Sequence, residues 1–270
     1  MIKWLKMENE KCKFCNSTAL VYHYSLCDST CEECGEWQEG EYLEGRSLFS
    51  TGSPFFHHKN IDDMKIAIVI PARLESKRLK EKMLIKFDDI PLIRLVFDKC
   101  RTMGYDTYVV TDSEEIAKHI TIGHAIMTGD CENGTARIAS VIDKFEEYDI
   151  IINVQGDMLD INVDTLRPLI KDCVHNDVTT CYTKGCKPDD VKVIHQEGHA
   201  MWFTRSNIGY GDRHLGIYAY RPHILRSYDL FDDEYSQEGL EQNRILGHYN
   251  MQVVRTEYDG VEINTEQDLF

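Results

Sequence analysis

The chain has 270 residues and is acidic, with 46 Asp and Glu against 30 Lys and Arg and a formal net charge of −16. Such a surface repels nucleic acid and anionic lipid, so a polyanion must be bound by a local basic cluster. No apolar run reaches the roughly 18 residues of a membrane-spanning helix, and the first residues lack the pattern of a secretory leader. We therefore expect a cytoplasmic protein with no membrane partner, and nucleic acid is disfavoured as a ligand.

The N-terminal segment carries a metal-binding cysteine pattern. Cys12 and Cys15 form one C-x2-C pair, and Cys31 and Cys34 form a second pair after fifteen residues. Four thiolates on two tight turns make a closed tetrahedral zinc site, so residues 1–44 are predicted to be a zinc-ribbon-like segment folded around structural Zn2+. The alternatives are reduced free cysteines and a redox pair. Such a ribbon is a candidate docking point for a protein partner.

The amino-acid composition changes after the cysteine-rich segment. Residues 45–63 are punctuated by Gly, Ser and Pro and are predicted to be a linker. In residues 64–270, β-branched apolar runs alternate with helical periodicity, which is typical of an α/β domain. The runs are continuous, which favours a mostly parallel sheet covered on both faces, and shorter pieces within residues 176–220 favour a small antiparallel extension. The predicted strands are residues 64–72, 107–112, 149–157 and 250–256, and the predicted helices are residues 91–104, 113–120 and 136–148.

A basic cluster follows the first predicted strand. Arg73, Arg78 and Lys82 come after Pro71 and Ala72, at the carboxyl end of a parallel strand, where open α/β sheets bind ligands. Guanidinium groups bind paired phosphate oxygens and a lysine neutralises further charge, so this loop suits a nucleoside triphosphate. Taken alone, the stretch has an equally good alternative, the solvated basic start of a helix.

Seven motifs, in order, resemble those of the 3-deoxy-manno-octulosonate cytidylyltransferases, the enzymes that make CMP-activated 3-deoxy-manno-octulosonate (Kdo). The resemblance covers residue 64 to the end and implies a Rossmann-like sheet of the nucleotide-diphospho-sugar transferase type. The motifs are IPARLESKRLKEK (70–82), MTGDCENGTARIA (127–139), NVQGD (153–157), KVIHQEGHAMWFTRSNI (192–208), RHLGIYAYR (213–221), LEQNRIL (240–246) and VEINTEQDL (261–269).

The resemblance implies a reaction and the residues that serve it. CMP would pass from CTP to the anomeric hydroxyl of a 3-deoxy 2-keto sugar acid, Kdo or a relative, with release of pyrophosphate. Asp157 and Asn264 would hold Mg2+, and the catalytic set would be Asp157, Lys82, Arg78 and Asn264. The implied CTP-binding residues are Ala72, Arg73, Ser76, Arg78, Lys82, Met127, Thr128, Thr135 and Arg137. The implied sugar-binding residues are Gln155, His214, Tyr218, Glu241 and Gln242, with Arg213 as a candidate for the sugar carboxylate.

Other interpretations stay open. Lys77 and Lys80 are expected on solvated surface, Asp112 as an end-of-strand residue or helix cap, and the sugar-binding side chains alternatively as ordinary strand packing. Asn264 stands where the family carries an aspartate, and the lost negative charge should weaken metal binding and activation of the hydroxyl. The alternative function is a catalytically weakened CTP- and sugar-acid-binding protein whose zinc ribbon docks a partner. The sequence leaves the sugar acid and the oligomeric state open.

Overall fold

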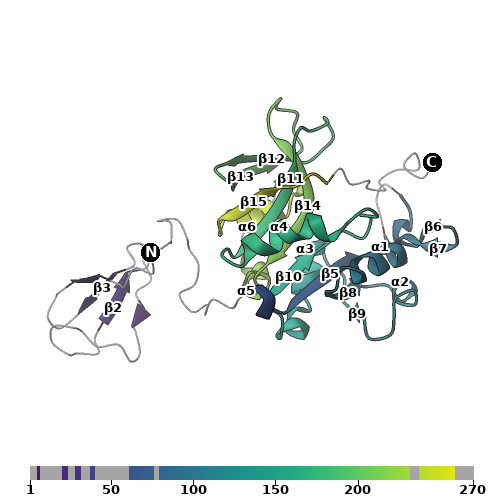
Figure 1. Cartoon of the computed structure of the whole chain (residues 1–270), viewed down its shortest axis with the longest axis horizontal. Coiled ribbons are helices and arrows are strands. Elements are labelled where there is room, and N and C mark those ends of the chain that lie inside the picture. The colour runs from purple at the N-terminus through teal and green to yellow at the C-terminus, as the bar shows by residue number, and fades with distance from the viewer. Residues whose placement is uncertain are drawn as a thin grey trace. The chain divides into compact units, whose positions relative to one another are not determined.

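The structure is a computed structural model, and it describes residues 61–75, 79–231 and 237–258 together with four short strands before residue 40. The chain forms two compact units, Met1–Ser50 and Thr51–Phe270 (Figure 1). In the first unit the strands form an antiparallel sheet in the order β1-β2-β3-β4. These strands are β1 (Leu5–Lys6), β2 (Leu20–His23), β3 (Asp28–Cys31) and β4 (Trp37–Glu39).

The predicted zinc ligands fall almost wholly outside the described part of the chain. Cys12, Cys15 and Cys34 are not among the described residues, and for Cys31 only its backbone position at the end of β3 is described. The zinc-ribbon prediction for residues 1–44 therefore stays a prediction.

The second unit is built on a nine-stranded sheet in the order β11-β15-β13-β12-β14-β10-β5-β8-β9. The strands β10, β5, β8 and β9 run parallel to one another, and β11 runs parallel to β15. The pairings that β14 makes with β10, β11 and β12 are antiparallel, as are those of β13 with β12 and β15. The strands are β5 (Ile66–Ala72), β8 (Asp106–Thr111), β9 (Ala125–Met127), β10 (Ile150–Asn153), β11 (Val178–Thr183), β12 (Lys192–Gln196), β13 (His199–Thr204), β14 (Asp212–Tyr220) and β15 (Met251–Arg255).

The sheet is mixed, so the prediction of a mostly parallel sheet is corrected, whereas the antiparallel extension predicted within residues 176–220 is present in the pairings of β12 with β13 and β14. The long strand β14 enters beside β10 in the antiparallel direction, with Ile151 opposite Tyr220 and Asn153 opposite Tyr218. Both strands carry continuous apolar runs because helices cover both faces of the sheet at this point. A continuous run therefore indicates that both faces are covered, and it does not report the direction of the neighbouring strand.

Helices cover both faces of the central strands. On one face, Phe97 of α1 and Leu169 of α4 are buried in a core with Ile68 of β5. On the other face, Ile138 of α3 and Leu225 of α5 are buried in a core with neighbouring β5 residues. The helices are α1 (Leu92–Arg101), α2 (Glu114–Ala117), α3 (Gly134–Ala139), α4 (Val163–Cys173), α5 (Pro222–Arg226) and α6 (Gln242–Leu246). Shorter elements are the 3-10 turns η1 (Ile61–Asp63), η2 (Lys82–Leu84), η3 (Ile142–Phe145), η4 (Tyr228–Leu230) and η6 (Gln237–Gly239) and the hairpin of β6 (Lys86–Phe87) and β7 (Ile90–Pro91).

The helix predicted at residues 136–148 is two separate elements. Asn133 caps the start of α3 by accepting a hydrogen bond from the backbone N–H of Ala136. The helix ends at Ala139, and Val141 has a non-helical φ of −126° before η3 begins. This early start places Thr135 and Arg137 in the first turns of α3, at the carboxyl edge of the parallel strands. Among the described residues, no helix is both long and apolar enough to span a membrane.

Candidate active site

A cleft of about 800 Å3 opens at the carboxyl ends of the parallel strands. The described lining residues come from the end of β5, from η2, from residues 131–134 and Arg137, from residues 155–157, from β14 and from residues 238–242. It brings together residues from both predicted ligand sets. The residues that line it include Ala72, Arg73, Lys82, Arg137, Gln155, Asp157, His214, Tyr218, Glu241 and Gln242.

The other predicted site residues lie elsewhere or outside the described part. Thr135 is fully buried beneath the cleft, and Met127 is about half exposed at the end of β9 and does not line it. Thr128 lies beside Arg137. Ser76, Arg78 and Asn264 are outside the described residues, and so is Lys77.

Lys82 and Asp157 form an ion pair in the cleft. Their side chains are only 9% and 15% exposed. Glu81, directly before Lys82, adopts a left-handed φ of 48°, which is uncommon for a residue with a side chain. A Cβ at Gly156, before Asp157, would lie 2.7 Å from the sulfur of Met83, so the Met83 side chain would have to shift. The pair places a cation and a carboxylate at the same point of the sheet edge.

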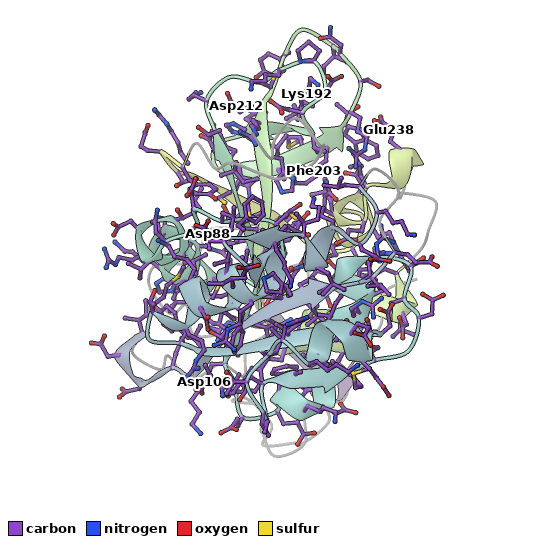
Figure 2. The ribbon with its side chains drawn as sticks, turned by 90° about the vertical axis from the view of Figure 1, so that its right-hand side faces the viewer. Asp88, Asp106, Lys192, Phe203, Asp212 and Glu238 are labelled. Atoms are coloured by element: carbon purple, nitrogen blue, oxygen red, sulfur yellow. The ribbon has the colours of Figure 1, made fainter. Side chains whose placement is uncertain are left out.

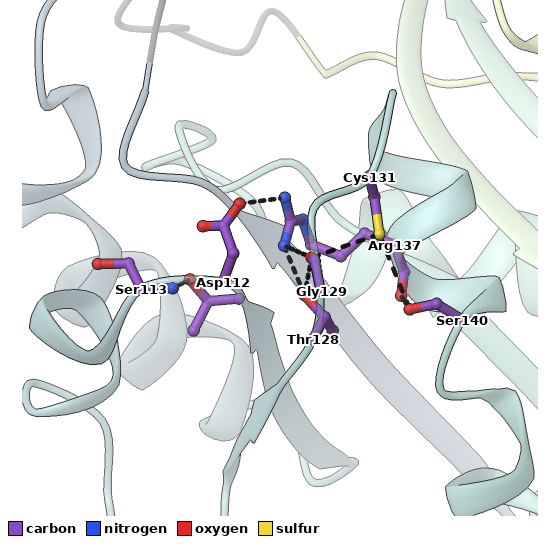
Figure 3. A network of polar contacts seen from close by, with 8 residues as sticks. Asp112, Ser113, Thr128, Gly129, Cys131, Arg137 and Ser140 are labelled. Carbon is purple, nitrogen blue, oxygen red and sulfur yellow. Dashed lines mark hydrogen bonds and ion pairs between the residues drawn. The ribbon is translucent and has the colours of Figure 1, made fainter.

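Arg137 organises a second polar group on the floor of the cleft (Figure 3). Its Nη1 donates to the hydroxyl of Thr128 at 2.5 Å and to the carbonyl of Gly129 at 3.2 Å. Its Nη2 forms an ion pair with Asp112 at 2.6 Å. The guanidinium is 3% exposed, so it acts mainly by holding the segment that follows β9 against the end of β8.

Asp112 has a partner that the sequence did not indicate. It follows β8 directly, as expected, but the cap of α2 is Ser113, whose hydroxyl accepts a hydrogen bond from the N–H of Ile116. The helix-cap alternative for Asp112 is therefore wrong. Its ion pair with Arg137 joins residues 25 positions apart, a contact that only the folded sheet edge creates.

Strand β14 and Gln155 contribute neutral hydrogen-bonding groups to the cleft. His214 of β14 contacts the hydroxyl of Thr180 through Nε2 at 2.9 Å, and burial lowers the pKa of His214 to about 3. Tyr218 is buried on the same strand, and burial raises its pKa well above the usual value. Gln155 donates to the carbonyl of Gly216 at 3.0 Å. These side chains are all uncharged near neutral pH.

Glu241 and Gln242 are adjacent in the chain but differ in their contacts. Glu241 accepts hydrogen bonds from the hydroxyl of Thr135 at 2.6 Å and from its N–H at 3.3 Å. Burial raises the pKa of Glu241, against the lowering effect of these hydrogen bonds. The side chain of Gln242 is almost fully buried at the cleft and makes no hydrogen bond to any described residue.

Arg205 is a cleft residue that the sequence interpretation missed. It follows β13, is exposed, and lines the cleft, whereas Arg213 does not line it and lies near Asp190, with Nε to Oδ1 at 3.7 Å. Arg205 lies in the family-like motif of residues 192–208, which carried no predicted site residue. Its position, a cation directly after a strand-like stretch in that motif, could have indicated a ligand-binding residue.

The carboxylate of Asp157 is the candidate metal ligand of the cleft. Among the described residues there is no group of three or more His, Cys, Asp and Glu side chains arranged to hold a metal ion. Asp157 presents a hard oxygen donor beside Lys82, whereas the other carboxylates that line the cleft are bound by other residues, namely Glu132 by Arg244, Glu238 by Thr204 and Glu241 by Thr135. Such a donor fits Mg2+, which is commonly held by one or two carboxylates together with substrate phosphates.

Comparisons with known proteins agree with this architecture. Residues 67–257 match the family model described as Cytidylyltransferase. The 3-deoxy-manno-octulosonate cytidylyltransferases of Acaryochloris marina and Fusobacterium nucleatum are 33% and 32% identical, each over 76% of this chain and 95% and 94% of the relative. A solved CMP:2-keto-3-deoxy-manno-octonic acid synthetase complexed with CTP is 31% identical, covers 76% of this chain and 95% of its own, and superposes with a TM-score of 0.68. The inositol-1-phosphate CTP transferase from T. maritima, at 14% identity and a TM-score of 0.60, shares the fold. The chain therefore belongs to the cytidylyltransferase family, among the relatives of the 3-deoxy-manno-octulosonate cytidylyltransferases.

Proposed function

We propose that this protein transfers CMP from CTP to the anomeric hydroxyl of a 3-deoxy 2-keto sugar acid, Kdo or a close relative, and releases pyrophosphate. The observation that carries the proposal is that one cleft holds two chemically different sets of residues. Arg73, Lys82 and Asp157 make up a charged set, and Gln155, His214 and Tyr218 make up an uncharged hydrogen-bonding set. The first suits a triphosphate and the second suits a polyhydroxylated sugar.

The nucleotide half uses the loop after β5. Arg73 is exposed at the cleft and makes no contact with another described side chain, so its guanidinium is available to phosphate oxygens. Lys82 adds a second cation to the same side. Arg137 holds Thr128 and Gly129 in place, and backbone groups of that segment suit the carbonyl and amine edge of a pyrimidine.

Asp157 fits a magnesium site shared with the substrate. When bound, Mg2+ would neutralise charge on the triphosphate and stabilise the charge that develops in the transition state. In the free protein Lys82 pairs with Asp157. We expect Lys82 to turn from this carboxylate to the phosphates when the nucleotide enters, because a phosphate oxygen then offers the stronger negative charge.

The sugar half lies against β14 and the chain around Gln242. Gln155, Tyr218 and Gln242 offer hydrogen bonds to sugar hydroxyls, and Arg205 offers a cation to the sugar carboxylate. The anomeric oxygen attacks the α-phosphorus, the bond from that phosphorus to the β-phosphate oxygen breaks, and pyrophosphate leaves with the electron pair. In the same step the proton of the attacking hydroxyl passes to solvent water. The protein contributes by positioning and by electrostatic stabilisation.

The N-terminal unit carries separate proposals. Structural Zn2+ on Cys12, Cys15, Cys31 and Cys34 would fold a ribbon in residues 1–44, because the cysteine spacing matches a closed tetrahedral site. Such a ribbon would serve as a docking point for a protein partner. The whole protein is proposed to work in the cytoplasm, where its nucleotide substrate is made.

A second function is favoured by one observation, the asparagine at position 264. If it disables metal binding, the protein would be a CTP- and sugar-acid-binding protein with weakened catalysis. Asn264→Asp separates the two functions. A gain in turnover of about tenfold or more indicates a weakened catalyst, since one charge on a metal site is worth at least that factor.

The test of the main proposal is a substrate panel. Each of the four ribonucleoside triphosphates is combined with Mg2+ and with Kdo, other 3-deoxy sugar acids or a neutral sugar, and pyrophosphate release is measured. We expect release only with CTP and a 3-deoxy sugar acid. Equal release with all nucleotides, or none with any sugar acid, would contradict the proposal.

A further inference from the structure

The polar side chains of residues 238–244 contact two separate parts of the second unit. One part is the end of β13, and the other is the start of α3 with the loop before it. Glu238 and Asn243 contact the first, and Glu241 and Arg244 contact the second. We name this stretch the 238–244 segment.

The contacts to β13 fix the strand end that leads to Arg205. Glu238 accepts hydrogen bonds from the hydroxyl of Thr204 at 2.7 Å and from the N–H of Arg205 at 2.5 Å. Asn243 accepts from the N–H of Phe203 at 3.1 Å and donates to its carbonyl at 2.9 Å. Figure 2 labels Glu238 and Phe203 in the same upper part of the molecule.

Glu238 has a left-handed φ of 64° and ψ of 9°, an unfavourable backbone conformation for a residue with a side chain. Its carboxylate is bound by two donors at the end of β13, and these contacts favour that conformation.

The contacts in the other direction reach the nucleotide side. Glu241 binds both the hydroxyl and the N–H of Thr135, in the first turn of α3. Arg244 forms an ion pair with Glu132 and lies over the ring of Tyr228, with its Cζ 4.6 Å from the ring centroid. Thr135 is fully buried, whereas Glu241 is partly exposed where it lines the cleft, so water competes little for the hydroxyl of Thr135.

Gln242 provides the contrast within the segment. Its side chain lines the cleft and has no hydrogen-bond partner among the described residues, so its amide is available to a substrate. The carboxylate of Glu241 is already bound to Thr135. Glu241 and Gln242 are adjacent and similar in shape, but only the side chain of Gln242 is left without a hydrogen bond to a described residue.

We propose that Glu241 is a positioning residue for the nucleotide side, and that the 238–244 segment couples the nucleotide side to the sugar side. The inference rests on the proposed function. Glu241 holds the first turn of α3, α3 carries Arg137, and Arg137 holds Thr128 and Gly129. CTP affinity in the absence of any sugar should therefore depend on Glu241, although Glu241 lies beside the sugar-binding residues.

The test measures CTP binding by calorimetry, with Mg2+ and without sugar, in Glu241→Ala, Glu241→Gln and Gln242→Ala. Glu241→Ala should weaken CTP binding about tenfold, because Thr135 loses its acceptor. Glu241→Gln should weaken it less than about threefold, because the amide oxygen still accepts from Thr135. Gln242→Ala should bind CTP like the wild type and raise the KM for the sugar acid.

Thr135 supplies the matched partner for a double-mutant cycle. If Glu241 acts through Thr135, Glu241→Ala combined with Thr135→Val should weaken CTP binding no more than the stronger single change. Should Glu241→Ala not fold, Thr135→Val removes the same hydrogen bond and should weaken CTP binding alone, whereas Thr135→Ser should restore it.

The possible results distinguish a failure of the positioning role of Glu241 from a failure of the proposed function. A wild-type protein that does not bind CTP contradicts the proposed function. A wild type that binds CTP, with Glu241→Ala and Thr135→Val binding it equally well, overturns the positioning role. In that case a raised KM for the sugar in Glu241→Ala would identify Glu241 as a direct sugar ligand.

Discussion

Lys82 and Asp157, separated by 75 positions in the chain, form an ion pair at the edge where β5 and β10 end. Two parallel strands bring them together, since both residues follow the carboxyl ends of neighbouring strands. The pair marks the point where we place the triphosphate and Mg2+.

Changes to this pair should affect different kinetic parameters. Asp157→Asn should lower kcat by about 10²- to 10³-fold, because it removes the carboxylate that fits the metal. Lys82→Met keeps the apolar stem and should raise the KM for CTP about tenfold by removing one phosphate contact. Steady-state pyrophosphate release measures both. Lys80→Met is the matched control on the exposed neighbour, and equal effects of Lys80→Met and Lys82→Met would contradict the assignment.

Asp112 should influence CTP binding without touching the nucleotide. Asp112→Asn keeps the shape of the side chain but removes the charge that holds Arg137 at 2.6 Å. Loosening of Thr128 and Gly129 should then weaken CTP binding about tenfold. Calorimetry with CTP and Mg2+ measures this. Asp143→Asn in η3 is a control carboxylate on exposed surface, and unchanged affinity in Asp112→Asn would show that the Arg137 network does not support the base site.

His214 should make the protein less stable in acid. Its folded pKa is about 3, below the ordinary value of 6.5, because the side chain is buried. Between these values the unfolded chain binds more protons at this position than the folded chain. The free energy of unfolding should therefore fall as the pH drops from about 6.5 toward 3, by up to about 1.4 kcal/mol per pH unit from this group.

Denaturant unfolding at several pH values measures this contribution. The wild type should lose more stability than His214→Gln between pH 6.5 and 4.5. Parallel pH dependence of the wild type and His214→Gln would mean that His214 is protonated in the folded protein.

The N-terminal cysteines should hold one zinc ion per chain. Elemental analysis of purified protein should find one equivalent, and Cys12→Ser with Cys15→Ser should abolish it. Cys186→Ser is the matched control, because Cys186 is exposed and free in the second unit. Pyrophosphate release should stay within about twofold in both variants, since the described residues that line the cleft all belong to the second unit. Zinc retained after loss of Cys12 and Cys15 would exclude the predicted ligand set.

The sequence indicated the strands well because each has a local signature. The runs that became β5, β8 and β15 were predicted within one or two residues, since β-branched apolar stretches mark covered strands. Strand direction had no such signature, so the antiparallel entry of β14 beside β10 was missed. Helix α4, capped by Asn162, was also not anticipated, although Asn at that position is a usual start signal.

The sequence predicted which residues belong to the candidate site, but it did not predict the contacts that these residues make. Family motifs identified Arg73, Asp157 and Gln242 as cleft residues, and the structure places them in one cleft. They did not indicate that Glu241 is bound to Thr135, or that Asp112 is bound to Arg137. Both contacts join segments distant in the chain, and one sequence contains no local signal for such pairs.

The most direct test of the central claim is identification of the products by mass spectrometry after the protein is incubated with CTP, Mg2+ and Kdo. We predict a CMP-sugar and pyrophosphate in equal amounts from the wild type, and at least a hundredfold less of both from Asp157→Asn. Pyrophosphate formed without a CMP-sugar, or equal product from Asp157→Asn, would contradict the assignment of this cleft as a cytidylyltransferase site.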